Sequence, residues 1–227
     1  MSIINITNLS KIYDGAGIKV KAVDNIDLRF EKGEFAAIVG PSGSGKTTLL
    51  NMLGGLDRPT SGEVVIDDQN IWELSQRKLT NFRLNKIGFV FQSYNLIPVL
   101  TAGENTEFIM HLQGKSKAER NSRTQELLEA VGIGDRSKSR PNKLSGGQQQ
   151  RVAVARALAS KPTFILADEP TANLDSKSTE TLLDIMEELN KNENITFIFS
   201  THDARVVAKA RRVITLVDGK VDSDELR

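Results

Sequence analysis

The sequence contains no cysteine, which excludes disulfide bonds and thiolate metal sites and fits a reducing compartment. It also has almost no net charge, because 30 lysines and arginines nearly balance 29 aspartates and glutamates. A protein that coats nucleic acid would need a marked basic excess, so we expect no nucleic-acid partner.

Long apolar runs are also missing, since none approaches the roughly 20 residues that cross a bilayer. Residues 1–5 lack a basic stretch followed by an apolar core, so we expect no signal peptide. A chain of 227 residues can form one substantial domain or two lobes that share a core. If the protein serves a membrane, we expect it to act from the aqueous side through a partner.

Apolar segments that alternate with helical patterns predict an α/β fold with a largely parallel sheet covered on both faces. Residues 93–140 read as a helical lobe inserted into this core, and Ser116 with Glu119 fits a capping box at a helix start. A turn is expected at residues 57–62. We expect strands at residues 3–9, 23–30, 35–39, 87–91, 164–167, 196–199 and 213–217, and helices at residues 46–53, 102–113, 116–131, 147–159 and 179–189.

The segment between the strand at 35–39 and the helix at 46–53 matches the phosphate-loop pattern G-x-x-x-x-G-K-[ST]. Glycines let the backbone curl so that its N–H groups point at phosphate oxygens, and the following helix dipole adds to the attraction. Lys46 is expected to reach the β- and γ-phosphates, and the Thr47 hydroxyl to ligate Mg²⁺. The motif comprises Gly40, Pro41, Ser42, Gly43, Ser44, Gly45, Lys46 and Thr47.

An acidic pair, Asp168 and Glu169, ends the apolar strand at 164–167. Taken alone, such a pair is more often a solvated strand end. Together with a phosphate loop, Asp168 is expected to hold Mg²⁺ through water, and Glu169 to orient or deprotonate the attacking water.

The stretch Leu144-Ser145-Gly146-Gly147-Gln148 places a serine and two glycines at a helix start, which makes a second anion site. The first loop already provides a phosphate-binding site for one nucleotide. A second anion site on the same chain therefore indicates that a second chain takes part. This pentapeptide resembles the signature of the ABC (ATP-binding cassette) family. The resemblance covers essentially the whole chain, because six separated elements agree in order.

The resemblance implies a P-loop NTPase with an antiparallel β subdomain, a core at residues 1–92 and 141–227, and a helical subdomain at about 93–140. It implies ATP and Mg²⁺ as cofactors and an ATPase that closes as a dimer around two MgATP. Each ATP would contact residues 40–48, Thr48 included, of one chain and Ser145–Gln148 of the other. Four further residues match family positions. Tyr13 would stack on adenine, Gln92 would touch Mg²⁺, and Asp175 would lie in the loop that crosses the dimer interface. His202 would contact the γ-phosphate, and it would be catalytic together with Glu169 and Lys46.

Three stretches resemble the lipoprotein-release and macrolide-export branch, namely residues 54–62, 88–98 and 148–151. This likeness implies a permease with a large extracytoplasmic domain, in some systems an extracytoplasmic adaptor, and a peripheral location on the cytoplasmic face of the bacterial inner membrane. Gly103 and Thr106 stand where this branch leads us to expect apolar residues. Tyr94, Leu96 and Ile97 are apolar for a loop, and we expect them to line a groove for a cytoplasmic helix of the permease.

Two other functions stay open at this point. A regulatory ATPase of the cell-division type would activate a membrane partner without transport, and its cassette is similar. A soluble ABC protein of DNA repair or translation would carry long coiled-coil insertions or two cassettes, and this sequence has neither.

Overall fold

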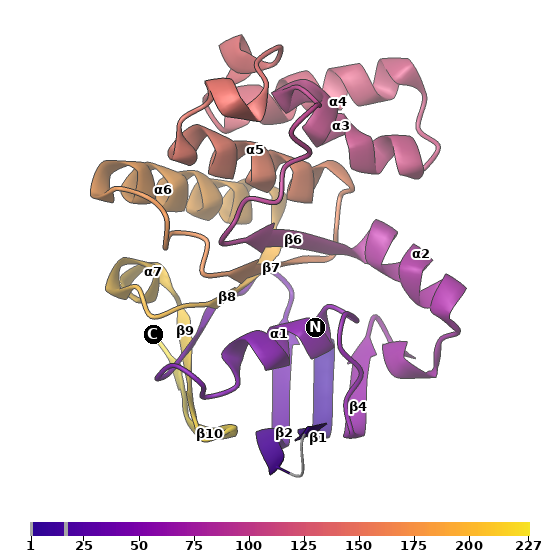
Figure 1. Cartoon of the computed structure of the whole chain (residues 1–227), viewed down its shortest axis with the longest axis vertical. Helices are drawn as coiled ribbons and strands as arrows, with labels where there is room; N and C mark the ends of the chain where they lie inside the picture. The colour runs from indigo at the N-terminus through magenta and orange to yellow at the C-terminus, as the bar shows by residue number, and fades with distance from the viewer. Residues whose placement is uncertain (1, 16–17) are drawn as a thin grey trace. The chain divides into compact units, whose positions relative to one another are not determined.

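The computed structural model describes residues 2–15 and 18–227, and its contacts divide the chain into two compact units. Unit 1 comprises Met1–Arg83 and Thr196–Arg227, and unit 2 comprises Leu84–Ile195. Figure 1 follows the chain through both units by residue number. Parallel strands, an antiparallel sheet and helices occur together, so the predicted α/β class is confirmed.

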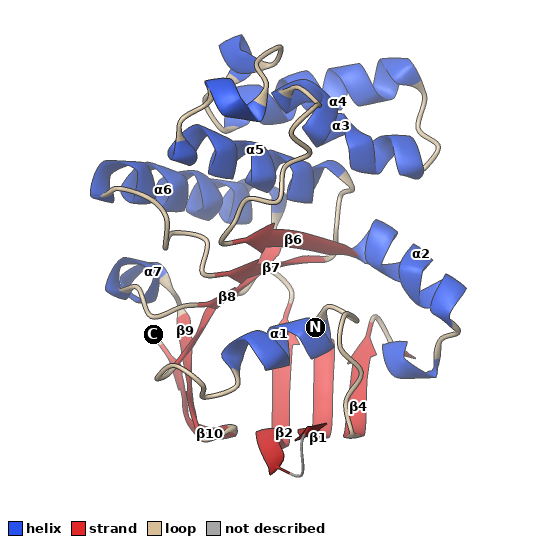
Figure 2. Ribbon diagram, viewed as in Figure 1, coloured by secondary structure: helices blue, strands red, loops and turns tan. Residues whose placement is uncertain are grey.

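An antiparallel sheet in unit 1 is built around a long hairpin (Figure 2). Its order is β2-β1-β4-β5, with β1 paired to both β2 and β4. The hairpin extends beyond the strands we expected, and its outer part is exposed. The strands are β1 (Ser2–Gly15), β2 (Ile18–Glu31), β4 (Ser61–Ile66) and β5 (Gln69–Asn70).

The second group of strands in unit 1 has the order β10-β9-β3-β8. β3 (Phe35–Val39) is parallel to both β8 (Thr196–Ser200) and β9 (Arg212–Val217), while β10 (Lys220–Leu226) is antiparallel to β9. The ring of Phe35 lies 5.7 Å from that of Phe197 and 4.7 Å from that of Phe199. Buried aromatic packing of this kind fixes the strands that carry the loops described below.

The helices of unit 1 are short. α1 (Lys46–Leu53) and α7 (Ala204–Lys209) follow β3 and β8 respectively, and the 3₁₀ turn η1 (Ile71–Glu73) precedes α2 (Gln76–Lys86), which continues into unit 2. The bounds of α1 agree with the sequence-based prediction.

Unit 2 contains two parallel strands, β6 (Ile87–Phe91) and β7 (Phe164–Asp168). The helix α5 (Gly146–Ala159) packs on β6, and its small side chains, such as Ala153, Ala155 and Ala157, are buried. The remaining elements are α3 (Ala102–Leu112), α4 (Lys117–Ala130), η2 (Gly134–Arg136), η3 (Pro141–Lys143) and α6 (Ser176–Glu193).

Capping boxes begin three helices of unit 2. The expected box at α4 is confirmed, because Ser116 Oγ accepts from the Glu119 N–H and the Glu119 carboxylate accepts from the Ser116 N–H. Thr101 and Glu104 form the same pair at α3. Each box satisfies two backbone donors that a helix start leaves open.

The two residues that depart from the family pattern are accommodated in different ways. A Cβ on Gly103 would lie 2.7 Å from Ser137 Oγ, and the Gly103 N–H donates to the Ser137 carbonyl over 2.8 Å. The absence of a side chain at Gly103 therefore lets the segment around residue 137 lie directly on α3. Thr106 is fully buried, and its hydroxyl donates to the Ala102 carbonyl of the same helix over 2.9 Å.

The sequence did not predict several elements. Residues 57–62 were expected to be a turn, but β4 begins at Ser61. α2 was missed because it is strongly polar and buries only Leu79 and Phe82, so its apolar period is weak. β5, α7 and β10 were missed because they are short or largely exposed.

We expect Gly88→Ala to destabilise the protein. A Cβ at this position would lie 2.8 Å from both the Ala157 carbonyl oxygen and Ile165 Cγ1, so α5 would have to move away from β6. Overpacking of this kind costs about 1–3 kcal/mol, which urea denaturation can measure. Gly15→Ala is the control, because a Cβ there meets no heavy atom within 4 Å. Equal stability of the two variants would contradict this close contact.

Candidate functional site

The phosphate loop of unit 1 joins β3 to α1. Gly40, Gly43 and Gly45 have φ values of 146°, 81° and 99°, a region that favours glycine. Gly45 is the N-cap of α1 and has no side chain that could accept a hydrogen bond from this helix start. Helix starts of this kind bind phosphate in other proteins, because their N–H groups point at the anion.

The lysine of the loop folds back over it. Lys46 Nζ donates to the Gly40 carbonyl over 2.8 Å and to the Pro41 carbonyl over 2.9 Å. The Ser44 hydroxyl is buried and makes no hydrogen bond to the described part of the chain. A charged donor and an unsatisfied hydroxyl in one loop fit an anionic ligand that accepts from several donors at once.

Two strands hold the loop from either side. A Cβ on Gly40 would lie 2.1 Å from the Leu216 carbonyl oxygen of β9, and one on Gly45 would lie 2.1 Å from the Ala22 carbonyl oxygen of β2. The Gly219 N–H also donates to the Ser44 carbonyl over 3.1 Å. The shape of the loop therefore depends on close backbone approach, which only glycine permits at these two positions.

Tyr13 and His202 are also in unit 1. Tyr13 on β1 is 42% exposed, and its hydroxyl donates over 2.5 Å to the carboxylate of Asp57, which follows α1. His202 is exposed and follows β8, whose Ser200 is paired with Ile38 of β3. The carboxyl ends of parallel strands meet at one sheet edge, so His202 and the phosphate loop leave the sheet side by side.

Gln92, Asp168 and Glu169 gather in the same way in unit 2. Phe91 of β6 is paired with Asp168 of β7, so Gln92 and Glu169 leave neighbouring parallel strands at the same edge. Glu169 has a φ of 45°, an uncommon conformation for a residue with a side chain. The sequence placed an amide and two carboxyl groups together here, and the structure brings them together.

The signature segment forms the start of α5. Ser145 Oγ accepts from the Gln148 N–H over 3.3 Å, and the Gln148 side chain accepts from the Ser145 N–H over 2.9 Å. A Cβ on Gly146 would lie 2.7 Å from the Tyr94 hydroxyl, and one on Gly147 would lie 2.8 Å from Ser178 Oγ. The two glycines thus let other loops of unit 2 approach this helix start.

Those loops are the segments after β6 and β7. The Asn173 side chain donates to the Gln92 carbonyl over 3.0 Å, and the Tyr94 hydroxyl donates to the Asn173 carbonyl over 3.4 Å. Asp175 caps α6 by accepting from Ser178, whose side-chain and backbone hydrogen bonds lower the pKa of the Asp175 carboxyl. The contact between Asn173 and Tyr94 had not been predicted: Tyr94 was expected to line a groove for the permease, and nothing local in the sequence marks its contact with Asn173.

Arg156 joins this region to a small groove. Its guanidinium donates to the Asn95 carbonyl over 2.5 Å and to the Tyr94 carbonyl over 2.9 Å, and burial lowers its pKa. Asn95 and Arg156 also line a hollow of about 230 Å³ together with Phe89, Phe91 and Ile109. We expected Tyr94, Leu96 and Ile97 to line a groove, but none of the three lines this hollow, to which their segment contributes Asn95. The Tyr94 hydroxyl contacts Asn173 instead, and the backbone of Ile97 is hydrogen-bonded to the Asn105 side chain.

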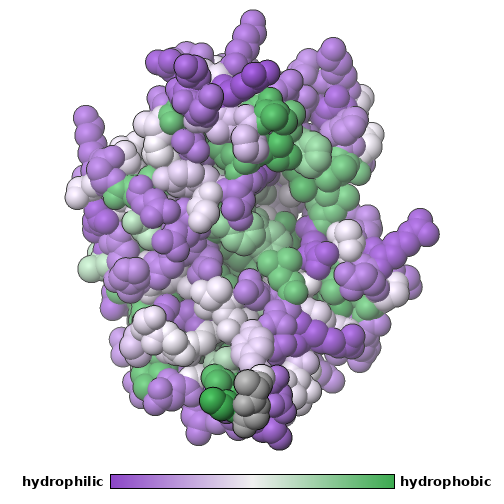
Figure 3. Space-filling model, in the orientation of Figure 1, coloured by the Kyte–Doolittle hydropathy of each residue, from purple (hydrophilic) through white to green (hydrophobic). Residues whose placement is uncertain are grey.

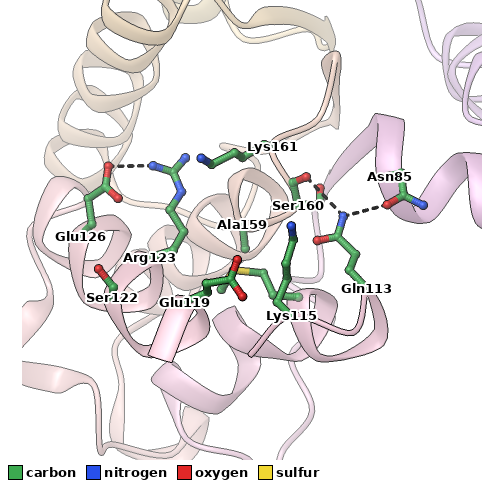
Figure 4. A pocket seen from close by; sticks show the side chains of 11 residues that line it. Asn85, Gln113, Lys115, Glu119, Ser122, Arg123, Glu126, Ala159, Ser160 and Lys161 are labelled. Carbon is green, nitrogen blue, oxygen red and sulfur yellow. Dashed lines mark hydrogen bonds and ion pairs between the residues drawn. The ribbon is translucent and has the colours of Figure 1, made fainter. Parts of the chain in front are cut away.

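A second hollow in unit 2, of about 560 Å³, lies between α3, α4 and the end of α5 (Figure 4). Arg123 forms an ion pair there with Glu126 over 2.7 Å. It forms a second ion pair over 3.0 Å with Glu193, which is not drawn in the figure. Gln113 donates to Asn85 and to the Ser160 carbonyl. None of the predicted site residues lines this hollow.

The metal-ligating residues expected from the sequence are Thr47, Gln92 and Asp168. They offer a hydroxyl, an amide oxygen and a carboxylate, hard donors that suit Mg²⁺ held jointly with phosphate oxygens. Across residues 2–15 and 18–227, no cluster of three or more His, Asp or Glu is arranged as a metal cage. Over the same residues, no helix has the length and apolar character of a membrane span.

Comparison with known proteins identifies the family. The family model described as ABC transporter matches residues 23–172. An uncharacterized ABC transporter ATP-binding protein of Thermotoga maritima is 48% identical over 99% of this chain and 96% of its own length. The lipoprotein-releasing system ATP-binding protein LolD of Syntrophotalea carbinolica is 42% identical over 97% of each chain.

Two further matches add a fused protein and a solved structure. The macrolide export ATP-binding/permease protein MacB of Hyphomonas neptunium is 47% identical over 98% of this chain, which spans 34% of that protein. The dimeric, ADP- and Pi-bound structure of the ATP-binding cassette MJ0796 of Methanocaldococcus jannaschii matches with a TM-score of 0.91 and 44% identity, over 99% of this chain and 98% of that one.

The chain belongs to the ABC transporter ATP-binding family. It is an ATP-binding cassette with the P-loop NTPase fold, and it hydrolyses ATP.

We expect Gly45→Ala to impair the phosphate loop far more than Gly43→Ala. Both positions have positive φ, which costs a residue with a side chain about 1–2 kcal/mol. A Cβ on Gly43 meets no heavy atom within 4 Å, whereas one on Gly45 overlaps the Ala22 carbonyl. Thermal unfolding and ATP titration should show reduced stability for both variants but lost ATP binding for Gly45→Ala alone. Equal ATP affinity of the two variants would refute this account of the loop.

Proposed function

We propose that this chain is the motor subunit of a membrane transporter and works as a homodimer around two MgATP. The observation that carries the proposal is the second anion site. Unit 1 holds a complete phosphate loop, while α5 of unit 2 begins with Ser145, Gly146 and Gly147 at a separate helix start. A dimer in which each chain offers its α5 start to the other chain's nucleotide gives both sites a use. The dimeric MJ0796 cassette supports this arrangement.

The side chains have the following roles in this proposal. Lys46 binds the β- and γ-phosphates, Glu169 orients and deprotonates the attacking water, and His202 contacts the γ-phosphate. Mg²⁺, held by Thr47, Gln92 and Asp168, supplies charge neutralisation when bound. Asp175 lies at the dimer interface, and Tyr13 stacks on adenine. Almost all of the catalysis is then positioning and charge stabilisation.

The nucleotide drives the motion because it binds the closed and open dimer differently. The γ-phosphate contacts the loop of one chain and Ser145–Gln148 of its partner, so ATP favours closure. Hydrolysis removes this bridge and the dimer opens. In this proposal residues 1–92 and 141–227 hold the nucleotide, and residues 93–140 form the helical subdomain that meets the permease.

The partner we propose is a permease with a large extracytoplasmic domain, which this chain drives from the cytoplasmic face of the membrane. The likeness to LolD and to the cassette part of MacB supports lipoprotein, lipid, peptide or drug export of this kind. The groove beside Phe89 and Phe91 is the docking site in this proposal, since these stacked rings and Ile109 give it apolar walls. Figure 3 shows apolar residues gathered at the surface over the α3 region. On α3, Phe108 and Leu112 are 38% and 54% exposed.

We expect Glu169→Gln to separate ATP binding from hydrolysis. The amide keeps the shape of the side chain but cannot accept the proton, so ATP stays bound and bridges two chains. Light scattering during gel filtration should show a dimer with MgATP and a monomer without it. Lys46→Ala should bind ATP at least 10-fold more weakly, about 1.4 kcal/mol, and stay monomeric.

Adding Ser145→Arg to Glu169→Gln gives the sharper control. Bulk and charge at the start of α5 should abolish the ATP-dependent dimer while ATP still binds the phosphate loop. Rapid hydrolysis by Glu169→Gln would end the catalytic assignment, and an ATP-loaded double variant that still dimerises would end the shared-site model.

For the permease groove, we expect Ile109→Glu to abolish co-purification of the membrane partner. A charge in an apolar groove must be desolvated when a helix docks on it, which disfavours the complex. Leu226→Glu is the matched control, because Leu226 is 82% exposed and lies on β10 of unit 1. Circular dichroism and thermal unfolding should show both variants folded. Equal recovery of the permease with both variants would place the docking site elsewhere.

A further inference from the structure

We propose that Asp57 and Lys11 are positioning residues that fix the Tyr13 ring and thereby set how tightly the chain holds the adenine base. The inference rests on the proposed stacking of Tyr13 on adenine and adds two residues to it. All three residues belong to unit 1.

A single carboxylate ties the other two side chains together. The Tyr13 hydroxyl donates to one oxygen of Asp57 over 2.5 Å, and Lys11 Nζ donates to the other over 2.5 Å. Lys11 Nζ also donates to the Arg58 carbonyl over 2.7 Å. Asp57 follows α1, so the bridge connects β1 to the segment that the phosphate-loop helix leads into.

Lys11 also decides which face of the Tyr13 ring is available. The two residues are two apart on β1 and point to the same side of the strand. Lys11 Nζ lies 4.9 Å from the centre of the Tyr13 ring, as in a cation–π contact. The ammonium therefore covers one face of the ring, and a base can stack on the opposite face.

The charges of the cluster keep this arrangement in place. Burial alone would raise the pKa of Asp57, but the hydrogen bonds from Lys11 and Tyr13 outweigh it and lower that pKa. Burial and the bond to Asp57 raise the pKa of the Tyr13 phenol, against an opposing hydrogen bond with Thr48. Asp57 thus stays an acceptor and Tyr13 stays a donor over the physiological range.

A Tyr13 ring that is already fixed in the free protein loses less conformational entropy when the adenine base binds. The hydroxyl donates to Asp57, which follows α1 along the chain, so the ring keeps a fixed relation to the end of the helix that follows the phosphate loop. Without Asp57, ATP would have to order the ring on binding. The expected loss is about 3- to 10-fold in ATP affinity, the range for immobilising one side chain.

A merely structural bridge would affect phosphate binding and base binding alike, so the experiment measures both. Calorimetric titration of the full chain compares MgATP with magnesium tripolyphosphate, which has the phosphates but no base. Asp57→Ala, Lys11→Met and Tyr13→Phe should each weaken ATP binding 3- to 10-fold and leave tripolyphosphate binding unchanged. Asp222→Ala and Lys32→Met, which change an exposed aspartate on β10 and an exposed lysine, should alter neither.

A double variant tests whether Asp57 acts through the ring. Asp57→Ala added to Tyr13→Phe should lower ATP affinity by less than the product of the single effects, because the shared hydrogen bond is already lost. Asp57→Asn keeps an acceptor oxygen and should bind ATP more tightly than Asp57→Ala. This variant also keeps the test valid if Asp57→Ala fails to fold.

Tyr13→Ala separates the two levels of the proposal. If it leaves the ratio of ATP to tripolyphosphate affinity unchanged, Tyr13 does not stack on adenine and both proposals for this residue fail. If it lowers that ratio while Asp57→Ala and Lys11→Met do not, the positioning inference alone is overturned. Parallel loss of ATP and tripolyphosphate affinity in Asp57→Ala and Asp57→Asn would also overturn it.

Discussion

The close approach of two backbone carbonyls to Gly40 and Gly45 is the constraint on which the phosphate loop depends. The Leu216 and Ala22 carbonyls lie where a Cβ would stand, so strands β9 and β2 hold the loop together with Lys46, whose Nζ donates to the Gly40 and Pro41 carbonyls. In this arrangement Gly45 begins α1 without a capping side chain. The antiparallel hairpin therefore supports the chemistry of the loop as well as carrying Tyr13.

Unit 2 has a comparable meeting of segments, built from hydrogen bonds. Gln92, Asn173 and the Tyr94 hydroxyl connect the ends of β6 and β7 to the start of α5. Arg156, three turns further along α5, holds the Tyr94 and Asn95 carbonyls from beside the apolar groove. Arg156 and the Tyr94 segment thus connect the groove to the signature segment, residues 144–148, through hydrogen bonds and a short stretch of chain within one unit.

The sequence predicted the elements whose apolar pattern or motif is strong. Phe35–Val39, Lys46–Leu53 and Ile87–Phe91 have the expected bounds, because a fully buried strand or a motif-bound helix has sharp ends. The polar helix α2 gave no such signal. The outer half of the β1–β2 hairpin is exposed, and the alternation at residues 18–22 was not assigned to a strand. Propensity and periodicity report burial, so elements that bury little stay invisible to them.

The candidate site divides along the same line. Contiguous motifs mark the phosphate loop, Asp168 with Glu169, and residues 145–148, and the structure shows the strand ends and helix starts that they require. Other contacts join residues that are far apart in the sequence, and only the folded structure identifies these partners. Asp57 is hydrogen-bonded to Tyr13 and Lys11, and Asn173 to Gln92. Asp57 lies inside a stretch that already pointed to a branch of the family, yet its contact with Tyr13 could not be read from that stretch.

The capping box at α5 determines which donors of that helix an anion can use. Ser145 Oγ already accepts from the N–H of Gln148, and the Ser145 carbonyl accepts the N–H of Gln149. The first four N–H groups of a helix start have no partner within the helix, and the capping box satisfies those of Ser145 and Gln148, which leaves those of Gly146 and Gly147. A phosphate arriving from another chain would therefore be met by two glycine amides. The serine caps the start of the helix, and the two glycines contribute the backbone N–H donors that remain unpaired there.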